Sequence, residues 1–185
     1  MNIYDNVCQA VKGIRRISNS TDPFRLCEEK RILVLTPNLG RDEDCIKGFF
    51  VKKNRIKTIT VNSDLPEVIQ RIILAHEFGH AMLHSDRRIC EFHDVGLYDE
   101  SSVMEKEANL FAGEFLLRDE DVLEAMNGDT TFFSAAAMLR VPAELLDFKF
   151  RVMKWKGYQL MEAPIDVRNN FLKNMEVPDN ADYYC

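Results

Sequence analysis

The stretch of sequence that decides the fold is His76-Glu-Phe-Gly-His80, an HExxH motif. Residues four apart lie on one face of a helix, so both imidazoles can reach a single ion at about 2.0 to 2.1 Å. Ile69, Ile72 and Ile73 fall within the same stripe, which an amphipathic helix turns toward its core. The motif therefore predicts a metal ion held between His76 and His80 on an inward-facing helix surface.

Glu77 lies roughly 100° round the helix from His76, at the edge of the apolar stripe. That position suits a carboxylate that takes a proton from the attacking water without binding the metal itself. The alternative is a chance HExxH in an ordinary amphipathic helix, which we expect in roughly one such chain in a hundred. We therefore interpret Glu77 as the catalytic base.

A catalytic metal needs a third protein ligand, and two acids of the next predicted helix compete for that role. Glu105 and Glu107 point about 200° apart, so they cannot both serve one ion. Glu107 shares a face with Phe111 and Glu114, where a carboxylate is costly unless it is paired. We therefore expect Glu107 to bind the metal, with Glu114 as second choice, and Glu105 to complete a capping box with Ser102.

Three further residues are candidates for a supporting role. The Cα of His84 lies about 12 Å along the helix from that of His76, too far to share its ion. We expect His84 to be packed or hydrogen-bonded nearby, and the alternative is that it polarises a substrate carbonyl. His93 and Tyr98 precede the second helix and are interpreted as loop residues, with oxyanion stabilisation as the alternative.

The rest of the chain predicts an α+β fold that is mostly helical, with a small antiparallel or mixed sheet before the HExxH helix. Ser63 or Asp64 is expected to cap that helix, which runs to about residue 84. The other expected elements are helices over 4–17, near 23, over 102–117, 131–139 and 142–155, a strand over 31–35 and a hairpin over 48–52 and 56–61.

Composition excludes several classes of function. The net charge of −6 argues against general affinity for nucleic acid, although residues 134–157 have helix-turn-helix rhythm and an excess of basic residues. We favour an amphipathic helix pair packed on the core over DNA binding by that segment. Five widely spaced cysteines without a CxxC pair argue against disulfides and a cysteine zinc site. The sequence has neither a signal peptide nor a membrane-length apolar run, so we expect a cytoplasmic protein.

Several short segments, in order and spacing, resemble the ImmA/IrrE family of metallo-endopeptidases. They cover about residues 20–157. The matching pieces are Lys47-Gly-Phe-Phe-Val51, Ile59-Thr-Val-Asn62, His76 to His84, Glu107-Ala-Asn-Leu-Phe-Ala112, Phe115-Leu-Leu117, Ser134 to Pro142 and Phe148-Lys-Phe150. One departure is that Leu117 is followed by Arg118-Asp119, where the family commonly has Met-Pro.

The resemblance implies a gluzincin-like, zincin-type domain over residues 1–157, with a tail over 158–185. It implies Zn²⁺ bound by His76, His80 and Glu107, with Glu77 catalytic. It also implies a partner, a helix-turn-helix transcriptional repressor whose cleavage relieves repression of a mobile element, prophage or stress genes. The alternative is a metal-holding module that binds the repressor without cutting it. The short tail favours the compact, mobile-element type.

Overall fold

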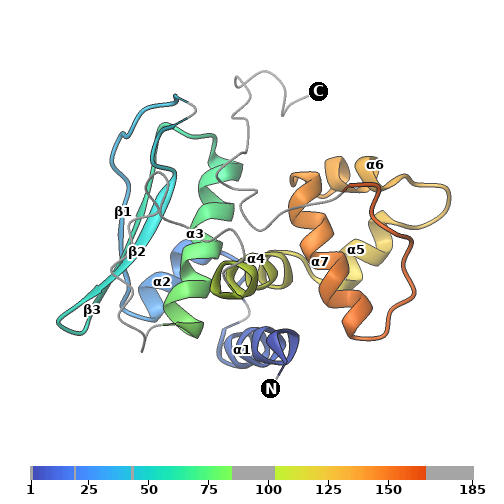
Figure 1. Cartoon of the computed structure of the whole chain (residues 1–185), viewed down its shortest axis with the longest axis horizontal. Coiled ribbons are helices and arrows are strands. Elements are labelled where there is room, and N and C mark those ends of the chain that lie inside the picture. The colour runs from blue at the N-terminus through green and yellow to red at the C-terminus, as the bar shows by residue number, and fades with distance from the viewer. Residues whose placement is uncertain (1, 19, 43, 85–102, 166–185) are drawn as a thin grey trace.

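The computed structural model describes residues 2–18, 20–42, 44–84 and 103–165. These residues form seven helices and a three-stranded sheet, which confirms an α+β, zincin-like fold that is mostly helical. In chain order the elements are α1 (Ile3–Ile17), α2 (Pro23–Glu29), β1 (Leu33–Leu35), β2 (Gly48–Lys53), β3 (Ile56–Val61), α3 (Glu67–Leu83), α4 (Val103–Leu116), α5 (Asp119–Ala125), α6 (Phe132–Met138) and α7 (Ala143–Trp155). In Figure 1, α3 lies between the sheet and α4, and α5 to α7 lie beyond α4.

The sheet is mixed, as predicted, with the strand order β1-β3-β2. β1 runs parallel to β3, and β2 pairs antiparallel with β3 as the second arm of the expected hairpin. The hairpin turns at Asn54 and Arg55, which both have positive φ, at 49° and 69°. Two positive φ values are what a tight two-residue hairpin turn requires. The paired residues Phe50 and Ile59 are both buried, so this face of the sheet belongs to the core.

Helix α3 is buried on nearly every side, whereas the sequence pattern indicated a single apolar stripe. Every residue from Leu74 to Ala81 is buried, because the sheet covers one side of α3 and α4 covers another. Two glycines permit this close packing. A Cβ at Gly48 of β2 would lie 2.4 Å from the side chain of Ile73, and one at Gly79 would lie 3.1 Å from the ring of Phe111. The HExxH residues therefore sit in the interior.

The predicted cap of α3 is wrong. The N-cap is Pro66, which provides no side-chain cap, and the helix begins at Glu67. Asp64 instead accepts hydrogen bonds from the side chain of Asn38, at 2.7 Å, and from the backbone N–H of Gly40, at 2.8 Å. At the other end, Lys57 of β3 donates to the carbonyl oxygen of Ala81, where a cation interacts favourably with the helix dipole.

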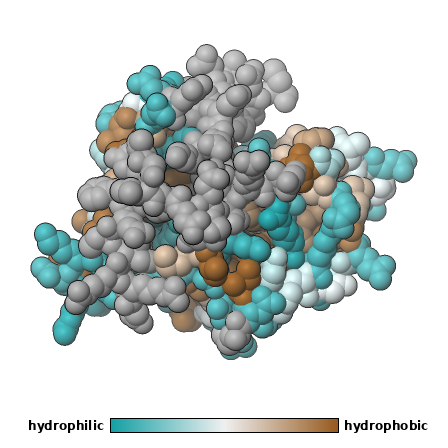
Figure 2. All heavy atoms as spheres, in the orientation of Figure 1, coloured by the Kyte–Doolittle hydropathy of each residue, from teal (hydrophilic) through white to brown (hydrophobic). Residues whose placement is uncertain are grey.

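The C-terminal helices pack on α4. The predicted pair appears as α6 and α7, whereas the short helix α5 was not expected. A Cβ at Gly113 would lie only 3.0 Å from the backbone nitrogen of Lys149, so this glycine lets α4 and α7 approach closely. In the view of Figure 2, hydrophilic and intermediate residues lie side by side over this helical end, with a few hydrophobic ones among them.

The basic residues of α7 are engaged by acids. Lys149 is completely buried and contacts Glu114 of α4 and Asp119 of α5. Lys156 also contacts both acids. Further along the same segment, Arg151 pairs with Asp147 and Lys154 pairs with Glu162. Four basic residues of the segment over 134–157 are thus paired with acids of the same chain, in agreement with a packed helix pair.

The described cysteines Cys8, Cys27 and Cys45 are free thiols. Burial raises the pKa of Cys27 to about 12, which makes this thiol a poor nucleophile. Among the helices described, none combines the length and apolar character needed to cross a membrane.

Candidate metal centre

His76 and His80 lie one turn apart on α3 and point at the same place. Both are buried, at 3% and 2% exposure. Their Nε2 atoms are 3.1 Å apart, and the two rings meet edge to face. The prediction that both imidazoles converge on one point from the interior of the fold agrees with this geometry.

The acid that completes this cluster is Glu105, not Glu107 as expected. One carboxylate oxygen of Glu105 lies 3.3 Å from Nε2 of His76, and the other lies 3.2 Å from Nε2 of His80. Among the described residues, these three form the group able to hold a metal ion. The expectation that Glu105 faces solvent is wrong, because its carboxylate lies against His76 and His80. The capping box with Ser102 stays a prediction, since Ser102 lies outside the described residues.

The spacing of these atoms fits a small divalent cation. Four ligands at about 2.0 to 2.1 Å in a tetrahedron are separated from one another by roughly 3.3 Å. The two Nε2 atoms are 3.1 Å apart, and each lies 3.2 to 3.3 Å from a different oxygen of the Glu105 carboxylate, which is close to that value. With one donor atom from each residue, the three atoms lie within 4.8 Å of one another. Two imidazole nitrogens and a carboxylate oxygen are also a common ligand set for catalytic zinc, which leaves a fourth position for water or substrate.

The electrostatics of the cluster also favour a bound cation. Burial acts to raise the pKa of Glu105, but its hydrogen bonds to His76 and His80 hold that pKa far below its usual range. Burial acts to lower the pKa of His76, but Glu105 and then Glu77 outweigh it and raise that pKa. An ionised carboxylate held against buried imidazoles creates a site that favours positive charge between them.

Glu77 follows His76 on α3 and is itself buried, at 3% exposure. The sequence placed it at the edge of an apolar stripe, but in the structure it lies in the interior because α3 is covered on nearly every side. Its charge contributes to raising the pKa of His76, the residue that precedes it on α3. This position is compatible with the proton-accepting role predicted for Glu77, which stays a prediction.

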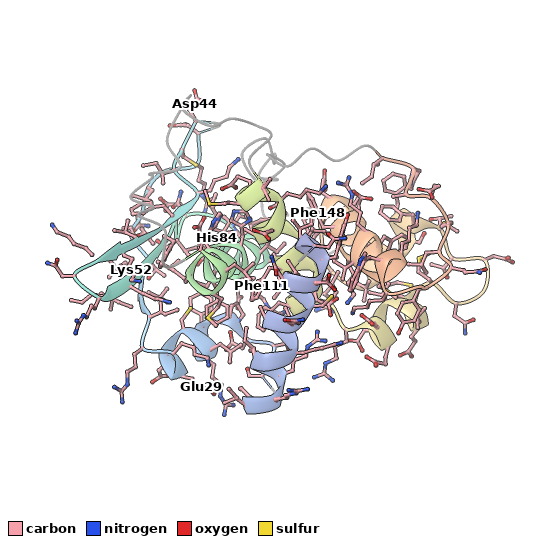
Figure 3. The ribbon with its side chains drawn as sticks, turned by 60° about the horizontal axis from the view of Figure 1, so that its bottom comes forward. Glu29, Asp44, Lys52, His84, Phe111 and Phe148 are labelled. Atoms are coloured by element: carbon pink, nitrogen blue, oxygen red, sulfur yellow. The ribbon has the colours of Figure 1, made fainter. Side chains whose placement is uncertain are left out.

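Glu107 instead contacts His84, at the C-terminal end of α3. Its Oε2 lies 2.9 Å from Nε2 of His84, and its Oε1 accepts a hydrogen bond from the side chain of Asn6 of α1, at 3.1 Å. His84 in turn places its Nδ1 3.1 Å from Nδ1 of His80. Figure 3 shows His84 near the middle of the molecule, over α3. His84 is thus buried and hydrogen-bonded, as expected.

The structure places Glu107 against His84 and away from His76 and His80, because α4 has no single inward face. All residues from Glu107 to Phe115 are buried, since α1, α3 and α7 surround this helix. An apolar face shared with Phe111 therefore indicated burial, but not which neighbouring helix Glu107 faces. The sequence did contain one signal in favour of Glu105, a polar residue, Asn109, one helical turn after it on the same face. In the structure Asn109 is fully buried and interacts with His76.

The remaining candidates fall elsewhere. Glu114, the second choice for a ligand, forms ion pairs with Lys149 and Lys156 on the far side of α4. His93 and Tyr98 lie outside the described residues.

A pair of histidines one turn apart on a buried helix, with an acid from the next helix, is the arrangement expected of a metallopeptidase. Residues 27–151 match the family Peptidase_M78, the IrrE N-terminal-like domain, and the chain belongs to this family. The match includes the whole sheet, both helices of the cluster and most of the C-terminal helices.

Two relatives extend this likeness. The chain is 32% identical over 146 residues to the uncharacterized immunity region protein 2 of Bacillus phage phi105, which covers 79% of this chain and 90% of the relative. It is 28% identical over 145 residues to the metallopeptidase ImmA of Bacillus subtilis (strain 168), which covers 75% of this chain and 80% of the relative. No solved structure matches the chain significantly.

Proposed function

We propose that this protein is a zinc-dependent endopeptidase that cuts a helix-turn-helix transcriptional repressor. The observation that carries the proposal is the convergence of His76, His80 and Glu105 from two helices, at separations suited to one cation. Its membership of a peptidase family supports hydrolysis of a peptide bond. We assign the metal ligands to these three residues and the role of general base to Glu77.

The mechanism follows from the position of each side chain. A divalent cation at this site would supply Lewis acidity toward the substrate carbonyl and the attacking water. His76, His80 and Glu105 hold that position from two packed helices, which fixes the geometry. Glu77 accepts the proton of the attacking water and delivers it to the leaving amine, a role typically worth 10²- to 10⁴-fold in rate. The surrounding core excludes bulk water and strengthens these interactions.

The proposed substrate rests on the family and on the names of the relatives. One relative is named for a phage immunity region, and the other is named as a metallopeptidase. The resemblance to the ImmA/IrrE family, whose members typically cleave helix-turn-helix repressors, supports a repressor as the target. Cleavage of that repressor would relieve repression of a mobile element, a prophage or stress genes.

The alternative is a module that binds the repressor and releases it from DNA without cutting it. A variant of Glu77 distinguishes the two functions, because only cleavage needs the general base. Purified protein loaded with Zn²⁺ is incubated with the repressor encoded beside it, and the products are identified by mass spectrometry. We expect one defined cut by the wild type and none by the Glu77→Gln variant, with unchanged cutting by Glu67→Gln, which alters an exposed acid of the same helix.

An intact repressor that is nevertheless released from its operator by both the wild type and Glu77→Gln would establish the binding module. Cleavage that persists in Glu77→Gln at the wild-type rate would remove Glu77 from the mechanism.

A further inference from the structure

Behind the proposed metal ligands lies a chain of polar side chains that the reaction itself does not use. It runs from His80 to His84, from His84 to Glu107 and from Glu107 to Asn6. His80, His84 and Glu107 are all buried. The chain links three helices, because Asn6 belongs to α1, His80 to α3 and Glu107 to α4, with His84 capping the end of α3.

The two ring nitrogens of His80 face different partners. Nε2 of His80 faces His76 and Glu105, whereas its Nδ1 faces His84. A metal-binding histidine is neutral and carries its proton on the nitrogen that does not face the metal. His80 therefore donates from Nδ1 to Nδ1 of His84.

This assignment fixes the rest of the chain. A neutral His84 that accepts at Nδ1 must carry its own proton on Nε2, and it donates that proton to Oε2 of Glu107. The other oxygen of Glu107 accepts from the amide of Asn6, which is a donor. Each donor meets an acceptor from Asn6 to His80, so one arrangement of protons satisfies all four side chains.

From this geometry we infer that His84 and Glu107 are positioning residues for His80. They fix the orientation and tautomer of its ring, and the negative charge at the end of the chain makes His80 a stronger ligand. His76 is supported differently, by the buried amide of Asn109. The inference rests on the proposed metal site, and it gives Glu107 a function distinct from direct metal binding.

The test is the affinity of the full chain for Zn²⁺, measured by competition with a chromophoric chelator, together with the visible spectrum of the Co²⁺ form. We expect Glu107→Ala to bind one ion per chain about 10- to 100-fold more weakly than the wild type, the usual cost of losing such a partner. Glu107→Gln keeps an acceptor for His84 and should recover part of that loss. Glu124→Ala, which changes an exposed acid of α5, should bind like the wild type.

A double-mutant comparison distinguishes a connected series of hydrogen bonds, in which Glu107 acts through His84, from two independent contacts. Because Glu107 acts through His84, the double variant of His84→Ala and Glu107→Ala should bind no more weakly than His84→Ala alone. Additive losses would overturn the inference. Asn6→Ala should weaken binding in the same direction, by a few-fold.

Two other results would also overturn it. Unchanged affinity and an unchanged Co²⁺ spectrum in Glu107→Ala would show that His80 needs no support from Glu107. Loss of the ion in Glu107→Ala as complete as in Glu105→Ala would make Glu107 a ligand. Either result, with a wild type that binds one ion, leaves the proposed peptidase intact. A wild type that binds no ion would remove the metal centre and the proposed function with it.

Discussion

Glu105 and Glu107 are separated by a single residue on α4, yet they contact different histidines of α3 and its C-cap. Glu105 reaches the Nε2 atoms of His76 and His80, and Glu107 reaches Nε2 of His84. Because the two carboxylates leave α4 in nearly opposite directions, one enters the proposed metal site and the other approaches it from behind.

The first prediction concerns Glu105. Replacing it by Ala should lower the affinity for Zn²⁺ by more than about 100-fold, beyond the 10- to 100-fold typical of residues that only support a ligand. The reason is that one of three protein donors is removed. Chelator competition measures this directly, with Glu124→Ala as the control. Wild-type affinity in Glu105→Ala would refute the ligand assignment.

The second prediction concerns the contact of α4 with α7. Gly113→Ala should destabilise the protein by about 1 to 3 kcal/mol, because its new Cβ meets backbone atoms of Lys149 and Leu145 at 3.0 and 3.3 Å. Gly13 of α1 is the matched control, since a Cβ there meets nothing within 4 Å. Gly13→Ala should stabilise by up to about 1 kcal/mol through helix propensity. Urea unfolding of both variants gives the comparison, and equal effects would contradict it.

The third prediction concerns the buried lysine of α7. Lys149→Met should lower the free energy of unfolding by about 3 kcal/mol, because Glu114 and Asp119 would lose a cation that is entirely shielded from water. Lys154→Met is the control on the same helix. Its partner Glu162 is 94% exposed, so this pair should be worth less than about 1 kcal/mol. A Lys149→Met variant as stable as Lys154→Met would show that the buried cluster contributes little.

The fourth prediction concerns the pH dependence of stability. Burial acts to raise the pKa of Asp119, but hydrogen bonds from Lys149 and Lys156 lower it below its ordinary 3.8. A lowered folded-state pKa adds stability that is present above pH 3.8 and is lost as the pH falls through the folded-state value. The melting temperature of Asp119→Asn should therefore fall less steeply than that of the wild type in acid.

The basic side of the same cluster behaves in the opposite sense. Burial acts to lower the pKa of Lys156, but Glu114 and Asp119 raise it above its ordinary 10.5. The stability it adds is present below pH 10.5 and is lost as the pH rises through the folded-state pKa. In the acid experiment on Asp119, equal falls in melting temperature with decreasing pH for Asp119→Asn and the wild type would contradict the role given to this cluster.

Much of the fold was predictable because its signals are local. The hairpin over β2 and β3, the helix that carries His76 and His80, and the helices α6 and α7 all follow from periodicity and turn residues. The short helix α5 was missed, because seven residues give too little periodicity to stand out. The prediction of the α3 cap was wrong, because Asp64 instead accepts a hydrogen bond from Asn38, which is distant in sequence.

The sequence by itself determined that two histidines one turn apart share a face, because helical spacing depends on nothing outside the helix. Which acid meets them depended on how α4 lies between α1, α3 and α7. A helix buried on all sides carries no record in its apolar pattern of which neighbour each residue faces. Only the packing of the helices therefore brought Glu105 to His76 and His80 and left Glu107 with His84.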